Sequence, residues 1–570
     1  MKKSMLASLL VPILLAGCSD SSTSSGNSSS GNYKWQIVHL ESVDESDLAA
    51  RCVIYADSTE ETDDSTIQEP EYQVITAYKA DEDYNIIYHN ADGSFDSSNV
   101  FNADELNDGL LSINPNDVPE NGYVTLEELS GDLRDDNRGS YMFSVQKSLL
   151  TDIVLNIPQI QTNTDCITGD DHREQALTKF VNVETLRGEL GDTSNYYQTS
   201  YDIDSIAGSD SPSDTPIAYS EGDKRDVLVT VFDDFTITDT SDSTETTTAT
   251  AALRTNLLGW GFIDYKLLYD AVFGDDGNFE LDSVDNKIQY EGSGKDDIST
   301  LDDVDLTDIT WSGLGLDTIT LDNESGVIAI HDDTTYLWQP IYDESTTITV
   351  AYETKEVDVW NSYFSGSVAL IDGDWDFTSF NSLSEEPTSI DVMDFSMLTS
   401  LDNVTISNSC TDVEDDEGVL TTPDFCVDLS SNFDSDDFNS QRFHIRLQEV
   451  NGTDIQTTFQ TIISPANSEP VILEANNVSF DTTTIPTLLR VELNLMKTDD
   501  DDLDAVQYLM SQNMDLVSLG LYGSNISDDA ETNFYTDLDG YISTKAETED
   551  LYQAVLKTNT TIVQSVYETP

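Results

Sequence analysis

The chain has 570 residues, and its 110 acidic against 24 basic side chains give a formal net charge of -86. This charge repels phosphate backbones and bare anionic lipid, so we expect no nucleic acid partner. High net charge is typical of disordered chains, but 38% of the residues are hydrophobic, and they gather in strand-like runs. We therefore expect a folded body adapted to salt, whose ions screen the repulsion between carboxylates.

The N-terminal segment combines a basic start, a short apolar run and small residues before a cysteine. Lys2 and Lys3 precede the apolar run 5–15, and the segment closes with Leu15-Ala16-Gly17-Cys18. Such a run is too short to cross a bilayer core, which takes about 20 apolar residues. The pattern resembles the signal peptide and lipobox of bacterial lipoproteins, although an ordinary secretory signal or a short membrane helix is the alternative. The resemblance covers only this segment.

The lipobox resemblance implies that residues 1–17 are removed and that Cys18 carries the lipid. Several acyl chains on one residue give a firm membrane anchor. In enterobacterial lipoproteins an aspartate directly after the cysteine favours inner-membrane retention, but here Ser19 follows. The implied location is therefore the outer membrane, on either of its faces. Residues 18–32 are rich in serine and glycine, so we expect a flexible tether.

Four cysteines remain beside Cys18, an even number that predicts two disulfides in an oxidising compartment. Of the three possible pairings we favour Cys52 with Cys166 and Cys410 with Cys426. The first pair falls within one N-terminal region, and the second is close in sequence. A zinc site is the alternative, but there is no CxxC spacing and the five histidines are scattered.

Residues 33–160 alternate short runs rich in Ile, Val and Tyr with turn residues, which predicts a β-sandwich-like domain. Asp92-Gly93 is expected to form a hairpin turn, because glycine tolerates positive φ. The strands expected here are Trp35–Leu40, Tyr72–Tyr78, Tyr84–Tyr88, Ser140–Val145 and Asp152–Ile157.

Beyond this region the pattern stays rich in strands. Residues 161–238 are expected to be mixed, with a helix within Glu174–Leu190 and a strand at Asp226–Thr236. An acidic Thr-rich linker precedes a β-rich domain at 251–383, and a β-rich C-terminal domain at 384–570 contains one helix near Leu503–Leu519. The predicted fold class is mainly β, with several immunoglobulin-like or related β-sandwich domains in tandem and minor helical content.

Two acidic segments are candidate calcium sites. Asp117, Asn121 and Glu128 match the first, fifth and twelfth positions of an EF-hand loop, but Pro119 stands at the third, and a hairpin turn with exposed acids is the alternative. The second candidate has DxDxD spacing, which on a strand would place three carboxylates on one face; it consists of Asp372, Asp374 and Asp376.

Aromatic residues alternate in the segment 336–342. Tyr336, Trp338 and Tyr342 would share one face of a strand. An exposed face of this kind could stack on sugar rings, whereas a buried one would belong to a sandwich core. The motifs GxSxG, HExxH, GxGxxG and the Walker loop are absent from the sequence.

These observations predict a non-enzymatic lipoprotein with a structural or interaction role in the cell envelope or surface coat, including the flagellar sheath. Calcium is a candidate cofactor, and other envelope proteins or glycans are candidate partners. One alternative is a surface glycan-binding protein or calcium-dependent adhesin. Another is a periplasmic hydrolase that uses a pair of carboxylates. With 110 acidic residues in the chain, such pairs arise by chance, so a pair in the sequence does not identify an active site.

Overall fold

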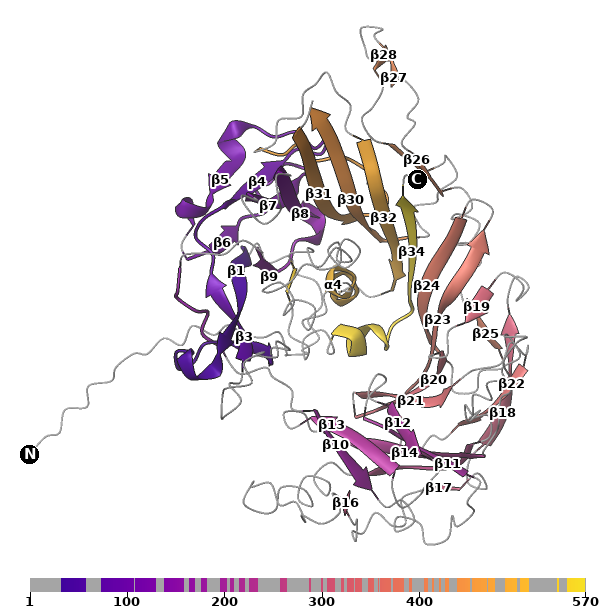
Figure 1. Cartoon of the computed structure of the whole chain (residues 1–570). Coiled ribbons are helices and arrows are strands. Elements are labelled where there is room, and N and C mark those ends of the chain that lie inside the picture. The colour runs from indigo at the N-terminus through magenta and orange to yellow at the C-terminus, as the bar shows by residue number, and fades with distance from the viewer. Residues whose placement is uncertain are drawn as a thin grey trace, which may run out of the picture.

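Most of the described residues lie in β-strands, so the predicted mainly β class is confirmed (Figure 1). The structure, a computed structural model, describes residues 32–57, 73–106, 108–129, 138–157, 163–169, 176–181, 195–201, 206–209, 215–220, 225–233, 257–263, 287–288, 299–300, 305–312, 319–321, 325–332, 334–340, 347–352, 357, 359–370, 373–383, 389–391, 404–407, 413–414, 420–421, 426–429, 438–451, 454–468, 470–476, 487–499, 503–511, 541–542 and 551–568.

One large sheet organises the molecule. Among the described residues it has thirteen strands, and it curves around the helix α4 (Asp504–Ser511) (Figure 1). Its order is β21 (Thr334–Pro340), β20 (Gly326–His331), β23 (Val359–Leu370), β24 (Gly373–Ser382), β34 (Thr560–Glu568), β32 (Thr487–Thr498), β30 (Ser440–Asn451), β31 (Asp454–Pro465), β8 (Arg138–Gln146), β7 (Tyr123–Leu129), β4 (Tyr84–His89) and β5 (Val100–Asn102), while β19 (Ile319–Leu321) pairs with β23.

This sheet joins segments that are far apart in sequence. The neighbours β31 and β8 run parallel, with Phe459 beside Tyr141, and β34 lies between β24 and β32. Three of the predicted domains, 33–160, 251–383 and 384–570, therefore contribute strands to one sheet. The predicted domain limits do not coincide with separate sheets, because long-range pairing between strands is not visible in local patterns.

A second sheet covers one face of the large sheet, and we call that face the inner face. The core between them includes Trp35 and Phe143, whose ring centroids lie 6.4 Å apart. Residues of α4 and of the helical segment 551–555 fill the same core. The second sheet has the order β2 (Ile54–Asp57), β3 (Gln73–Lys79), β1 (Tyr33–Asp44), β9 (Ile153–Asn156) and β33 (Tyr541–Ile542), and β6 (Leu110–Ile113) pairs with β1.

The opposite, outer face of the large sheet carries another core, rich in tryptophan. Trp338 of β21 packs between Trp260 and Trp360, with centroid distances of 5.2 and 4.9 Å. Trp260 belongs to a five-stranded sheet with the order β12 (Ile206–Ser209), β11 (Asn195–Ser200), β14 (Val227–Asp233), β15 (Leu257–Ile263) and β17 (Ser299–Thr300).

Smaller sheets and short 3-10 helices complete the described elements. The sheets are β13 (Thr215–Ser220), β10 (Ala176–Val181) and β16 (Lys287–Ile288); β22 (Thr347–Tyr352), β18 (Asp305–Ser312) and β25 (Ser389–Asp391); β26 (Val404–Ser407) with β29 (Cys426–Leu429); and β27 (Val413–Glu414) with β28 (Leu420–Thr421). The 3-10 helices are η1 (Glu45–Asp47), η2 (Ser97–Asn99), η3 (Ala103–Glu105) and η4 (Lys147–Leu149).

The expected local elements are partly confirmed. The five strands predicted within 33–160 correspond to β1, β3, β4, β8 and β9, and the helix predicted near Leu503–Leu519 overlaps α4 (Asp504–Ser511). The helix predicted within Glu174–Leu190 is wrong over its described part, because Ala176–Val181 forms β10 and pairs antiparallel with β13. There the cross-strand partner overrides the helical spacing of apolar residues.

Candidate functional site

Three side chains that no sequence motif links come together beside the β20–β21 hairpin. His331 ends β20, Asp332 follows it in the turn, and Asp226 immediately precedes β14. His331 Nε2 lies 3.5 Å from Asp226 Oδ2 and 3.7 Å from Asp332 Oδ2. One nitrogen or oxygen atom from each of the three side chains lies within 4.8 Å of the other two. We call this group the Asp226–His331–Asp332 cluster.

Neighbouring aromatic residues fix the position of this cluster. The Phe262 ring stacks on the His331 imidazole at a centroid distance of 4.0 Å and an interplanar angle of 20°. The Tyr336 hydroxyl donates a hydrogen bond to the Asp226 backbone oxygen at 2.8 Å. The cluster is therefore held from two sheets at once, because Phe262 lies on β15 and Tyr336 on β21.

The cluster is buried on one side and open on the other. The side chains of His331 and Asp226 are 16% and 27% exposed, whereas that of Asp332 is 85% exposed. One imidazole and two carboxylates can offer nitrogen and oxygen ligands to a cation. Sequence reasoning missed this group because Asp226 and His331 are 331 - 226 = 105 residues apart, and the only local signal is the adjacent pair His331-Asp332.

The aromatic face predicted as a glycan platform lies in the core. Tyr336 is 1% exposed and Trp338 is 0% exposed, and both belong to the outer-face core. Tyr336 and Trp338 share one face as predicted, but the five-stranded sheet with β14 and β15 covers both rings, so they cannot stack on a sugar. Tyr342 lies outside the described residues. The glycan-binding interpretation of Tyr336 and Trp338 is therefore wrong.

The EF-hand-like segment does not form one ligand loop. Asp117 and Asn121 are exposed in a turn, and Asn121 has φ +54°. Glu128 is 2% exposed on β7, opposite Tyr84 and Tyr141 of the two neighbouring strands. A strand rises about 3.3 Å per residue, so Glu128 lies about 17 Å beyond the start of β7. The three side chains cannot converge on one ion, and this calcium prediction is corrected to a turn followed by a buried strand.

The second calcium candidate lies partly outside the described residues. Asp374 and Asp376 stand two positions apart on β24, so they share a face of the strand. Asp376 is exposed, and the intervening Trp375 is buried. Asp372 and the side chain of Asp374 are not described, so this site remains a prediction.

One predicted disulfide is present. Cys52 and Cys166 are bonded, with their Cα atoms 5.5 Å apart and a sequence separation of 114. Cys166 belongs to the segment 163–169, which lies between residues 51–53 and the end of β3: Val53 donates to Ile167, and Ile167 donates to Ala77. Cys18 and Cys410 lie outside the described residues, and the side chain of Cys426 is not described.

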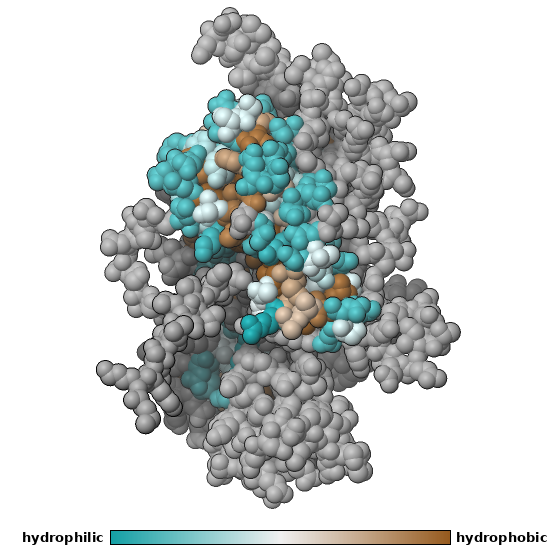
Figure 2. All heavy atoms as spheres, turned by 90° about the vertical axis from the view of Figure 1, so that its left-hand side faces the viewer, coloured by the Kyte–Doolittle hydropathy of each residue, from teal (hydrophilic) through white to brown (hydrophobic). Residues whose placement is uncertain are grey.

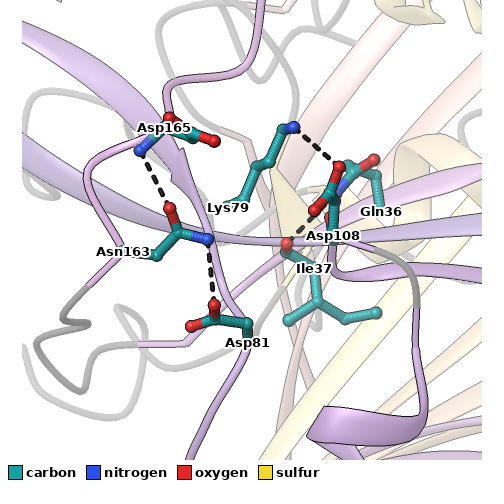
Figure 3. Close-up of polar contacts among 7 residues, drawn as sticks. All are labelled: Gln36, Ile37, Lys79, Asp81, Asp108, Asn163 and Asp165. Atoms are coloured by element: carbon teal, nitrogen blue, oxygen red, sulfur yellow. Dashed lines mark hydrogen bonds and ion pairs between the residues drawn. The ribbon is translucent and has the colours of Figure 1, made fainter.

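Polar contacts hold the same region beside the disulfide (Figure 3). Lys79 Nζ pairs with Asp108 Oδ2 at 2.9 Å, and Asn163 donates to Asp81 Oδ2 at 3.0 Å. Asn163 Oδ1 also accepts from the backbone N–H of Asp165 at 2.9 Å. These contacts tie the Cys166 segment and the loop before β6 to β3, so they serve the local fold.

No family model matches the chain, and no curated protein or solved structure matches it either. Among the described residues, no helix is long and apolar enough to cross a membrane. Function must therefore be argued from the chain's own residues.

Proposed function

We propose that this chain is an acidic lipoprotein, anchored through Cys18 in the outer membrane, with a non-enzymatic structural or interaction role in the cell envelope or surface coat. The observation that carries the proposal is the Cys52–Cys166 disulfide. Structural disulfides form and persist in oxidising compartments outside the cytosol. Together with the lipobox pattern ending at Cys18, the disulfide favours an exported and anchored body.

The way the tether meets the body fits an anchored role. Residues 18–32 lead directly into β1, which begins at Tyr33 and pairs with β3, β6 and β9. Hydrogen bonds of an antiparallel ladder stand perpendicular to the strands. A force applied to the tether along β1 would therefore be shared by many of these hydrogen bonds at once. The disulfide adds a covalent link between Cys52, just before β2, and the segment 163–169, which bridges to the end of β3.

The surface around the N-terminal strands suits contact with water and ions. On the face that carries the N-terminal strands, hydrophilic residues surround smaller hydrophobic areas (Figure 2). With a net charge of -86, the chain would attract cations and basic partners and repel anionic ones. The glycan-binding alternative loses its main support, because Tyr336 and Trp338 are buried.

Membrane fractionation of cells expressing the wild-type chain and a Cys18→Ser variant tests the proposal. The wild type should sediment with the outer membrane, and the variant should be released in soluble form. A Cys410→Ser variant controls for the loss of a cysteine that is predicted to form a disulfide and has no predicted role in anchoring. If the Cys18→Ser variant stayed with the membrane as the wild type does, the anchor would be disproved.

A further inference from the structure

The distances from His331 to the two carboxylates of the Asp226–His331–Asp332 cluster are longer than hydrogen bonds and fall in the range shared by ion pairs and by ligands of one metal ion. N–H to O hydrogen bonds span about 2.7 to 3.2 Å between heavy atoms. The two contacts of His331 Nε2 are longer, at 3.5 and 3.7 Å. Ligands about 2.0 to 2.1 Å from a tetrahedral metal ion are separated by about 3.3 to 3.4 Å. The two distances from His331 Nε2 are within a few tenths of an ångström of that edge, and all three candidate ligand atoms lie within 4.8 Å of one another.

From this geometry we infer that Asp226, His331 and Asp332 form a binding site for a divalent transition-metal ion of the zinc type. Imidazole nitrogen together with carboxylate oxygen suits zinc and related first-row metals. Calcium is a poorer fit, because it takes six to eight oxygen ligands and no imidazole. The site differs from both calcium segments considered from the sequence, and it does not depend on the lipid anchor.

The surroundings hold the ligands in place before the metal arrives. The Phe262 ring restricts rotation of the His331 imidazole, and the Tyr336 hydroxyl fixes the backbone at Asp226. His331 and Asp226 are mostly buried, so their side chains have little freedom to lose on binding. Asp332 lies on the exposed side, where the ion can enter and where water or a partner's side chain can complete its coordination.

The fold position of the site gives metal binding a structural consequence. Asp226 precedes β14 of the five-stranded sheet, and His331 ends β20 of the large sheet. An ion held between them would link the two sheets beside the tryptophan-rich outer core. Because a metal that binds only the folded state stabilises it by mass action, the linked sheets should unfold at a higher temperature.

The inference can be tested by zinc titration of the full-length protein in detergent. Millimolar Mg²⁺ is included so that it occupies carboxylates that bind cations without specificity. Calorimetry should show about one tight site per chain, and Zn²⁺ should raise the melting temperature. Co²⁺ in place of Zn²⁺ should give the intense visible absorption of tetrahedral coordination. His331→Ala should abolish the tight site and the Co²⁺ spectrum.

Asp332→Asn is the second variant, because Asp332 is exposed and its φ of +45° is tolerated by asparagine. It should fold normally and weaken zinc binding about tenfold or more. Asp104→Asn, which removes an exposed acid far from the cluster in sequence, should bind as the wild type does. Absence of a tight site in the wild type, or equal binding by the wild type and Asp332→Asn, would overturn the inference and leave only ion pairs.

Discussion

Gly93 and Ile472 approach so closely that a Cβ atom on Gly93 would lie 2.5 Å from the Ile472 carbonyl oxygen. Residues 470–476, which we call the strap, cross the outer face of the sheet at this point. Gly93 O accepts a hydrogen bond from Glu474 N at 3.0 Å. The amide of Gln460 bonds both backbone groups of Leu473, at 2.8 and 3.0 Å. The loop after β4 and the strap are thus joined through backbone atoms.

Gly93→Ala should destabilise the protein by about 1 to 3 kcal/mol, because Gly93 has φ +81° and its Cβ position is occupied. Chemical denaturation measures the loss, and hydrogen exchange should show faster exchange in the strap. Ser98→Ala, an exposed change in the same loop, should stay within about 0.5 kcal/mol of the wild type. Equal stability of the two variants would mean that the strap is not seated on Gly93.

Acid should loosen the same contact through His89. The side chain is 0% exposed; Nε2 bonds the Glu474 carbonyl oxygen at 2.9 Å and Nδ1 bonds the Thr125 hydroxyl at 2.9 Å. A neutral ring donating from Nε2 and accepting at Nδ1 satisfies both partners. Burial lowers the pKa of His89 from 6.5 to about 4.

Between about pH 6.5 and 4 the unfolded chain therefore binds a proton that the folded chain does not. Stability from the neutral ring is full above about pH 6.5 and falls by roughly 3 kcal/mol as the pH drops to about 4. Measured against pH, the unfolding free energy of His89→Gln should fall less steeply than that of the wild type in this window. Carboxylates and His39 titrate in both proteins and cancel. Parallel curves would contradict the assignment.

Removing the disulfide should weaken the N-terminal sheet. The double variant Cys52→Ser/Cys166→Ser should lose about 2 to 5 kcal/mol of unfolding free energy, because the bridge closes a long loop in the unfolded chain. Peptide mapping without reductant should recover residues 52 and 166 of the wild type in one linked peptide. Recovery of the two cysteines in separate peptides would show that the pair is not bonded.

Trp338 should behave as a core residue. Trp338→Ala should cost about 3 to 5 kcal/mol, because the ring is 0% exposed and contacts Trp260 and Trp360. Val359→Ala, at an exposed position of β23 (43%), is the control and should change stability by less than about 0.5 kcal/mol. A Trp338→Ala protein as stable as the wild type would contradict burial of the ring.

The sequence alone was sufficient to predict the features that local residues determine. Short runs rich in Ile, Val and Tyr, bounded by turn residues, predicted β1, β3 and β4, because these strands are buried over much of their length and β4 over all of it. Cys52 and Cys166 were paired correctly because one region contains both. The Ala176–Val181 strand was missed, since its partner β13 lies beyond any local window.

The sequence did not predict which side chains are buried or which distant strands lie side by side. Alternation placed Tyr336 and Trp338 on one face, but a face is exposed or covered according to which sheet packs on it, here β14 and β15. The same holds for the Asp226–His331–Asp332 cluster, which exists only because β14 and β20 meet. A chain with 110 acids offers too many carboxylates for such a pairing to be recognised from composition.

The most direct test of the central claim is the intact mass of the protein purified from its native membrane. The account predicts a chain that begins at Cys18, lacks residues 1–17 and carries a thioether-linked diacylglyceryl group with an added acyl chain. A chain that retains Met1, or one cut elsewhere with an unmodified Cys18, would contradict the lipoprotein assignment.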